Sequence, residues 1–590
     1  MTMTNDRTEG PRVLIDQHRA LQTALATLTF VVCALCAFAT PAWAAKKAGD
    51  EAFLRRVEVM EKRIGDQDAL LMAQAKQIAA QQTQLDALQS MTAQKTASLP
   101  TSALVGARVG ARVGASVGAS QSDAERIAVL EDQALKASVL ESDRPHISMA
   151  LGRPTIASAD DRYTFSPRAV VQLDAAHYDQ QSRAAAKDFR RGSVGAANNR
   201  DTAAAQDLSD GAYFRRSRFG FEGTFERDFS YRLMLELAGS GTEGPARIND
   251  AWVSYTGLAP WTVQIGAFSP PANMADGTSV EDLLFAERPA VAELSRTLAG
   301  ADGRIGVGVR YDAQRGMAAL TGTGRTVNDA EVFDSQFAMV GRTSWLAFTD
   351  ESTYNVHLGA SLTYVLTPPD AGNTAGTARY ALRLRERPEI RVDSARLIDS
   401  GAIDAAHAAV IGGEFGANWR SLLLQGEYFA FDFAKRKPIT PHDLEFSGWY
   451  LEGSWVITGE MHRYNVRSGA FQSPRPTRLF APLQDGWGAW ELAVRYSHAN
   501  LNDNPGVRGQ ALALGGIRGG EQNIWSLGLN GYLTPNVRVM FSYLDVAVDQ
   551  LNPKGTASAT PFGAGTLTPP TGVDVGQDLK VWTMRTQFSF

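Results

Sequence analysis

Short segments in which apolar and polar residues alternate recur from about residue 145 to the C-terminus. In one of them, Val537, Val539 and Phe541 alternate with Arg538 and Ser542. Successive side chains of a β-strand point to opposite faces, so each segment is predicted to form a strand with one apolar and one polar face. Apolar outside and polar inside is typical of an outer-membrane barrel. A soluble β-sandwich with one solvated face is the alternative, but arginines in the middle of many segments favour the barrel.

The length and the last segment extend this prediction. In residues 145–590, sixteen strands would have roughly 28 residues each for strand and connection, which suits barrel strands. No apolar run of about 18 residues follows residue 40, so no transmembrane helix is predicted there. The chain ends in an alternating strand with a C-terminal phenylalanine, which looks like the signal read by the barrel-assembly machinery. The predicted fold is all-β, a transmembrane antiparallel barrel of sixteen strands, preceded by an α-helical coiled coil.

Residues 1–44 have the pattern of an export signal. Three arginines precede a mostly apolar stretch at residues 21–39, and residues 42–44, Ala-Trp-Ala, form a small-x-small cleavage site. Cleavage there would leave a mature chain that begins near Ala45; an uncleaved anchor is the alternative. Both cysteines lie in this segment, so the mature chain would have no disulfide framework and no thiol chemistry. Export without cysteine suits a bacterial envelope protein.

Residues 45–95 are predicted to form a periplasmic coiled coil. Apolar residues recur every seven positions, and glutamine occupies three of the companion d layers. The apolar a positions are Val57, Ile64, Leu71, Ile78 and Leu85. A single amphipathic helix is the alternative. Residues 96–144 hold the repeat VGAR-VGAR-VGAS-VGAS and a short predicted helix, which we interpret as a linker to the barrel at residues 145–590.

Five arginines alternate with mostly apolar residues between positions 379 and 391. If this segment is a strand, its arginines share one face and lie about 7 Å apart. One arginine facing lipid costs roughly 2–4 kcal/mol near the membrane midplane, so a barrel must turn this row toward its lumen. Fixed cations in a pore favour the passage of anions, whereas in a soluble sheet the row would be a solvated face. The row consists of Arg379, Arg383, Arg385, Arg387 and Arg391.

Further arginines are predicted on the inward faces of other strands. Arginine stays charged at physiological pH and grips oxyanions with a planar fork of donors, so these residues join the candidate anion lining. They are Arg216, Arg218, Arg304 and Arg310, with Arg342 and Arg495 as additional inward positions. One group of carboxylates is interpreted as loop packing against these arginines rather than as a catalytic set: Glu281, Asp282, Glu287 and Glu293. The eight histidines are scattered without metal-ligand spacing, so no enzymatic activity, metal or cofactor is predicted.

A series of motifs runs in order through the barrel half. It includes Gly152-Arg153-Pro154, Phe214-Arg215-Arg216-Ser217-Arg218, Asp250-Ala251-Trp252-Val253, Phe285-Ala286-Glu287-Arg288, Gly448-Trp449-Tyr450 and Gly488-Ala489-Trp490-Glu491-Leu492. Together these motifs resemble the phosphate- and pyrophosphate-selective porins, the porin O and P family. The resemblance implies a trimer of sixteen-stranded barrels, an arginine ladder and a constriction built by a folded-in third loop. Two departures thin the basic lining near that constriction: Ser269-Pro270-Pro271 after the third strand and Ala169-Val170-Val171 in the first.

We expect an outer-membrane diffusion channel for phosphate or related oxyanions, with the N-terminal region in the periplasm. The formal net charge of −5 does not oppose this, because local charges set the field in a narrow lumen. The expected partners are inorganic phosphate or other small anions, outer-membrane lipid, the barrel-assembly machinery and two further copies in a homotrimer, with no nucleic acid. The alternative is a structural envelope protein that uses the coiled coil to tether the barrel to peptidoglycan or a periplasmic partner.

Overall fold

The computed structural model describes residues 145–150, 152–182, 208–239, 246–329, 333–372, 378–437, 440, 442–553, 572 and 574–590. The predicted export signal, coiled coil and linker lie outside the described residues, so their boundaries stay predictions. The described residues belong to one compact unit, which spans Arg126–Phe590.

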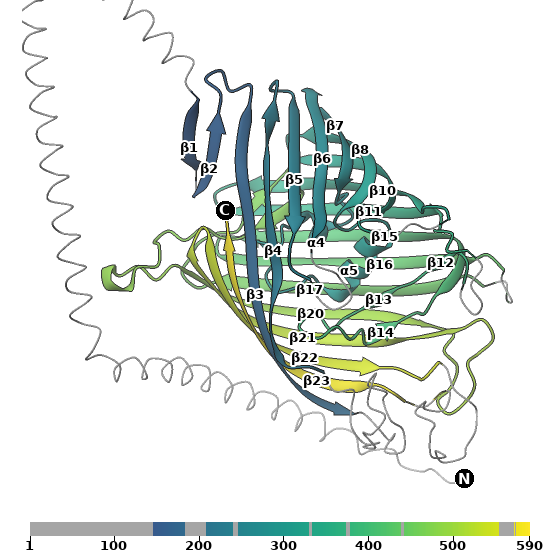
Figure 1. The fold of residues 1–590 in the computed structure, drawn as a ribbon. Helices are drawn as coiled ribbons and strands as arrows, with labels where there is room; N and C mark the ends of the chain where they lie inside the picture. Colours follow the sequence, from purple (N-terminus) through teal and green to yellow (C-terminus); the bar gives the residue numbers. More distant parts are fainter. Residues whose placement is uncertain are drawn as a thin grey trace, which may run out of the picture. The chain divides into compact units, whose positions relative to one another are not determined.

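Sixteen antiparallel strands form a closed barrel, as predicted (Figure 1). Each strand pairs with the next, and the last strand, β23, pairs with the first barrel strand, β3, from Ser182 opposite Gln577 to Val170 opposite Ser589. The first eight barrel strands are β3 (Thr164–Ser182), β4 (Gly211–Phe225), β5 (Phe229–Glu236), β6 (Arg247–Leu258), β7 (Trp261–Phe268), β8 (Arg304–Ala313), β9 (Gly316–Thr326) and β10 (Phe337–Asp350). The other eight are β11 (Tyr354–Thr367), β15 (Ile403–Trp419), β16 (Leu422–Lys435), β17 (Leu444–Val456), β20 (Ala489–Asp503), β21 (Ile517–Thr534), β22 (Val537–Asp549) and β23 (Gln577–Ser589).

The alternation in the sequence becomes the two faces of the barrel wall. On β23, Trp582, Met584 and Phe588 are about 40% exposed and point outward, whereas Leu579 and Arg585 are buried on the lumen side. Apolar side chains toward lipid and polar ones toward the lumen are the arrangement that a membrane barrel requires, since hydrocarbon cannot solvate charges. The period-two pattern therefore predicted both the strands and their inward faces.

The two ends of the barrel differ in the length of their connections. Turns of two or three residues join β4 to β5, β6 to β7, β8 to β9, β10 to β11, β15 to β16 and β21 to β22. Longer connections join the strands at the other end. Outer-membrane barrels have short periplasmic turns and long extracellular loops, so the end with these short turns is periplasmic. A hairpin of β1 (His146–Ala150) and β2 (Arg153–Ala157) extends β3 at this end, close to the C-terminus (Figure 1).

Three long connections fold inward. The third loop, residues 269–303, carries α4 (Met274–Gly277) and α5 (Ala290–Ala299), and α5 lies inside the barrel (Figure 1). The fifth loop, residues 368–402, carries β12 (Ala381–Leu382), β13 (Arg385–Glu386) and β14 (Ile398–Asp399). The periplasmic segment, residues 457–488, carries β18 (Arg463–Asn465), β19 (Ala470–Gln472) and the 3₁₀ helix η3 (Pro482–Gln484). No helix in the described ranges is long and apolar enough to cross a membrane.

The inward loops share a hydrophobic core with the barrel wall. Val291 and Leu294 of α5 are buried in one cluster with Phe429 of β16 and Tyr450 of β17. Ile390 of the fifth loop belongs to the same cluster. Because α5 buries nearly all of its residues, the third loop is a packed element of the lumen.

Candidate functional site

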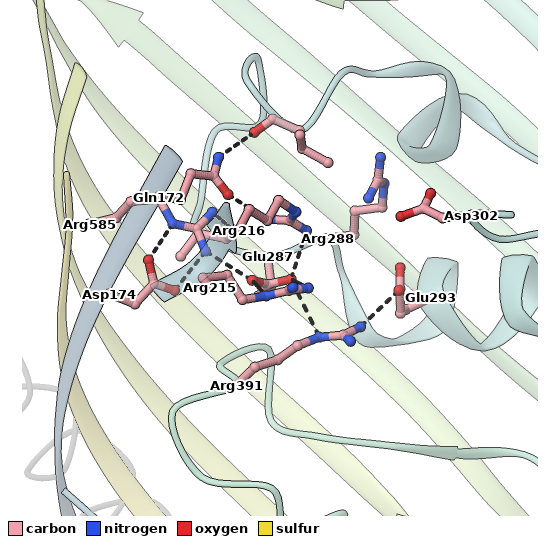
Figure 2. A network of polar contacts seen from close by, with 12 residues as sticks. Gln172, Asp174, Arg215, Arg216, Glu287, Arg288, Glu293, Asp302, Arg391 and Arg585 are labelled. Carbon is pink, nitrogen blue, oxygen red and sulfur yellow. Dashed lines mark hydrogen bonds and ion pairs between the residues drawn. The ribbon is translucent and has the colours of Figure 1, made fainter. Parts of the chain in front are cut away.

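The carboxylate of Glu287, in the third loop, lies among four guanidinium groups (Figure 2). It accepts hydrogen bonds from Arg215 Nε at 2.7 Å and Arg585 Nη2 at 2.9 Å. Its Oε2 lies 3.6 Å from Arg216 Nη2 and 3.5 Å from Arg391 Nε. We call these five residues the Glu287 cluster. Burial would raise the pKa of the Glu287 carboxyl, but Arg215 and the other guanidiniums hold it well below its ordinary value.

A β-bulge brings two consecutive arginines of β4 into this cluster. Gln172 of β3 pairs with Arg216, and the next residue, Leu173, pairs with Phe214, so Arg215 has no partner in the ladder. Both arginines are buried, at 5% and 2% exposure. Regular alternation would have pointed Arg215 into lipid, at a cost of roughly 2–4 kcal/mol near the midplane. Two adjacent arginines in a barrel strand cannot both face the lumen without a bulge, so the pair Arg215-Arg216 is the signal in the sequence. The prediction from regular alternation did not include this bulge.

Strand side chains hold the third loop by its backbone carbonyls. Asn530 of β21 donates to the Leu284 carbonyl at 3.0 Å, and Arg495 of β20 donates to the Glu287 carbonyl at 3.1 Å. Arg585 of β23 donates to the Ala286 carbonyl. The same Arg585 grips Asp174 of β3 with two bonds, at 2.6 and 2.7 Å. The carbonyls of a buried loop need donors, and the barrel wall supplies them.

A second set of ion pairs fixes the end of α5. Arg218 of β4 contacts Glu236 at 2.8 Å and Asp302 at 2.7 Å. Arg296 contacts the same Asp302 at 2.9 Å. Arg304 of β8 donates to the Gly300 carbonyl at 2.9 Å, which satisfies a free carbonyl at the helix C-terminus. Arg218 and Arg304 are buried and each binds the third loop. Their role as anion lining stays a prediction.

The segment with the arginine row is not one barrel strand, which corrects the expectation for residues 379–391. It lies in the fifth loop, and within residues 379–391 the paired strands are the two-residue β12 and β13. Glu389 has a φ of 59° that ends the extended run. The alternating segment forms paired strand only in β12, at residues 381–382, and in β13, at residues 385–386. The fifth loop packs on the third, since Glu389 accepts a bond from the Ala290 N–H at 2.8 Å. Arg391 also contacts Glu293 at 2.8 Å.

The five arginines of that segment have different surroundings. Arg379 binds Asp370 with two donors, and Arg383 binds Asp399; both side chains are nearly half exposed. Arg385 lies on β13 and is half-buried. Arg387 and Arg391 are buried. Only Arg391 joins the Glu287 cluster, so the structure does not bring the five together as one row.

The remaining predicted inward arginines also have acidic partners. Arg310 lies 2.9 Å from Asp312. Arg342 of β10 binds Glu414 of β15 at 2.8 Å and the Ser468 carbonyl of the periplasmic segment at 2.7 Å. Arg342 thus ties that segment to the barrel wall.

The carboxylates of the third loop pack against arginines, as the sequence predicted. Glu287 and Glu293 contact Arg391, and Glu281 lies 3.4 Å from Arg153 and 3.6 Å from Arg168. Within the described ranges, no group of three or more His, Cys, Asp or Glu side chains is arranged to hold a metal ion. The arrangement is a buried network of fixed charges along the lumen side of the wall.

Comparison with known proteins gives one family match and two sequence relatives. The model of the phosphate-selective porin O and P family matches residues 188–561. Porin O of Pseudomonas aeruginosa is 24% identical over 371 residues, which cover 58% of this chain and 78% of that protein. An uncharacterized protein of Caulobacter vibrioides is 26% identical over 354 residues, covering 57% of this chain and 63% of that protein.

Solved porins have a similar barrel at low sequence identity. The trimer form of OmpT of Vibrio cholerae is 11% identical, with a TM-score of 0.40, covering 73% of this chain and 100% of that one. An anion-selective porin of Comamonas acidovorans is 11% identical, with a TM-score of 0.40, covering 72% and 100%. At these values neither structure carries an argument about this chain. The family match covers more than half of the sequence and agrees with the closed barrel and its inward third loop. The chain is an outer-membrane porin that belongs to the phosphate-selective porin O and P family.

Proposed function

We propose that the protein is an anion-selective diffusion channel for phosphate or related oxyanions. The observation that carries this proposal is the Glu287 cluster, in which one carboxylate is shared by four guanidiniums. Arg585 also pairs with Asp174, and Arg391 also pairs with Glu293. Arg215 and Arg216 share the Glu287 carboxylate, so the wall beside the third loop carries a local excess of positive charge. The family match and the name of the Pseudomonas relative support the same function.

Arginine suits this role for two physical reasons. Its charge does not depend on pH in the physiological range, and its planar fork matches the oxygens of phosphate. Two unit charges of opposite sign 4 Å apart attract by roughly 1 kcal/mol in water and 4 kcal/mol near a protein surface. An attraction of this size favours entry of an anion without trapping it deeply. Arg379 and Arg383, nearly half exposed on the fifth loop, would meet an extracellular anion early. Nine arginines form the predicted anion lining, five in residues 379–391 and four on other strands. Their contact with a passing anion stays a prediction.

The test is the reversal potential of purified protein in a planar bilayer under a salt gradient. Wild type is expected to prefer anions. Arg391→Gln should reduce the preference, and Arg383→Gln, Arg385→Gln and Arg387→Gln together should reduce it if the fifth loop sets selectivity. Arg478→Gln is the matched control, because this exposed arginine lies at the periplasmic end, away from the cluster. A cation preference of the wild type would overturn the proposal.

We also propose that the channel works as a trimer. The barrel wall is short on one side, because β5 and β7 have 8 residues each, whereas β3 has 19 and β21 has 18. In a trimer, the short sides of neighbouring barrels would contact and shield one another. A trimer is also what the resemblance to the family implies. Light scattering of the full-length protein in mild detergent should give the mass of three chains. A monomer under these conditions would contradict the proposal.

A further inference from the structure

A cavity of about 130 Å³ lies at the periplasmic mouth of the barrel. One ordered water needs only roughly 10–15 Å³ of such space, so the cavity can hold a larger polar ligand. Five separate parts of the chain line it: the β1–β2 hairpin, the tip of the third loop, the periplasmic segment, the region around the β21–β22 turn and the end of β23. Its charged lining residues are Arg153, Glu281, Asp282, Arg463, Arg475 and Arg538.

Arg538 is a buried cation in the lining of this cavity, and two of its donors lack an acceptor among the described residues. Its side chain is 3% exposed and lies over the ring of Tyr532, with its Cζ 4.6 Å from the ring centre. Its Nη1 donates to the Glu281 carbonyl at 3.2 Å. Its Nε and Nη2 have no hydrogen-bond partner among the described residues. Buried charged donors without an acceptor are costly, so their presence in a cavity points to a ligand that supplies acceptor oxygens.

Arg463 of β18 adds a second guanidinium to the lining. Its Nε is also buried and has no partner among the described residues. Burial lowers the pKa of Arg463, the neighbouring Arg475 lowers it further, and Asp282 raises it. These influences place Arg463, Arg475 and Asp282 within electrostatic reach of one another. Arginine stays protonated despite such a shift, so the cavity holds a concentration of positive charge.

The two carboxylates in the lining are already engaged. Asp282 accepts a hydrogen bond from the Ser473 N–H at 3.0 Å. Glu281 lies 3.4 Å from Arg153 and 3.6 Å from Arg168. With four arginines and two carboxylates in the lining, positive charge is in excess, and the unused donors belong to Arg463 and Arg538.

We propose that this cavity binds a phosphate-type oxyanion, with Arg463 and Arg538 as its donors and Arg153 and Arg475 as flanking charges. The inference deepens the proposed function, because the site would be where a permeating anion pauses before release into the periplasm. The oxyanion has two possible sources: free phosphate from the pore or the phosphate of a lipid headgroup.

The test is calorimetric titration of full-length protein in detergent, freed of lipid, with inorganic phosphate. Arg463→Gln and Arg538→Gln should each weaken binding by about tenfold, since a charge-assisted hydrogen bond is lost. Arg538→Lys, which keeps the charge without the fork, should weaken it less. Arg478→Gln, from the same segment but outside the lining, should bind as wild type.

The outcomes separate this inference from the channel proposal. Heat-dependent migration on a gel shows that each variant has a folded barrel. A folded Arg463→Gln or Arg538→Gln variant that binds phosphate as tightly as wild type overturns the site, whatever the reversal potential shows. A wild type that prefers cations overturns anion selectivity while the binding site stands. Titration with a short-chain phosphatidylglycerol assigns the source: tighter binding than inorganic phosphate identifies the lipid headgroup, and weaker binding identifies the free anion.

Discussion

The arginines around Glu287 and those at the periplasmic mouth carry the same side chain in contrasting surroundings. Around Glu287, guanidiniums from three elements bond to carboxylates and to the carbonyls of the third loop. At the mouth, Arg538 keeps two buried donors without partners in the described structure and Arg463 keeps one, whereas in the Glu287 cluster Arg216 keeps one, its Nε. Donors that bond to the protein's own groups fix its loops, and we propose that the partnerless donors at the mouth bind a ligand. The number of inward arginines in a sequence is therefore a poor measure of the cations that an anion meets.

The largest expected effect comes from removing the shared carboxylate. Glu287→Gln removes the carboxylate that four buried guanidiniums share, although Arg585 keeps Asp174 and Arg391 keeps Glu293. The change should cost about 3–5 kcal/mol, as expected when one partner of a buried ion pair is lost. Urea unfolding in detergent measures the loss, and hydrogen exchange in residues 284–302 should increase. Glu226→Gln, which removes an exposed partner of Arg162, is the control and should leave the unfolding midpoint unchanged. Equal stability of both variants would mean that the cluster does not hold the third loop.

A smaller effect should separate the mouth from the Glu287 cluster. A Cβ on Gly416 of β15 would lie 2.6 Å from the ring of Phe471, so Gly416→Ala should push the periplasmic segment away from the wall, toward the lumen, at about 1–3 kcal/mol. Phosphate binding should then weaken, because Arg463 and Arg475 belong to that segment. Hydrogen exchange should increase near Leu284 and Phe285, which pack with Phe471, but not in α5. Gly413→Ala on the same strand is the matched control, because a Cβ there meets nothing within 4 Å. Loss of protection in α5 of Gly416→Ala would show that the mouth and the Glu287 cluster are coupled.

The smallest effect concerns pH. Burial raises the pKa of Glu281, so the folded protein takes up a proton there at a higher pH than the unfolded chain does. Acidification from pH 7 toward 5 therefore stabilises the fold slightly and removes a negative charge from the mouth. Sulfate, whose charge is constant over this range, should bind more tightly at pH 5, by less than about tenfold. Glu281→Gln should abolish this dependence; if it persists, another group is responsible.

The sequence predicted the barrel because every membrane strand must turn its apolar side chains toward lipid and its polar ones toward the lumen. Trp582 and Arg585 lie on opposite faces of β23 for the same reason that they differ in polarity. Packing of the third-loop carboxylates against arginines was also predictable, since buried charges of opposite sign must meet. The fifth loop was predicted wrongly because the segment before Glu389 alternates like a strand, and only long-range contacts show that it packs on α5. The inward fold of residues 457–488 depends on partners such as Arg342, more than 100 residues away, which local pattern does not reveal.

The contact between Arg585 and the third loop has a consequence for the order of assembly. Arg585 and the Ala286 carbonyl that it binds are 299 residues apart in the chain, and Arg585 lies on the last strand to be synthesised. The same side chain joins the last strand to the first through Asp174. The third loop therefore cannot complete its docking until the two ends of the sheet have met. Protection of the third loop should therefore reach its full extent only after β23 has paired with β3 and closed the barrel.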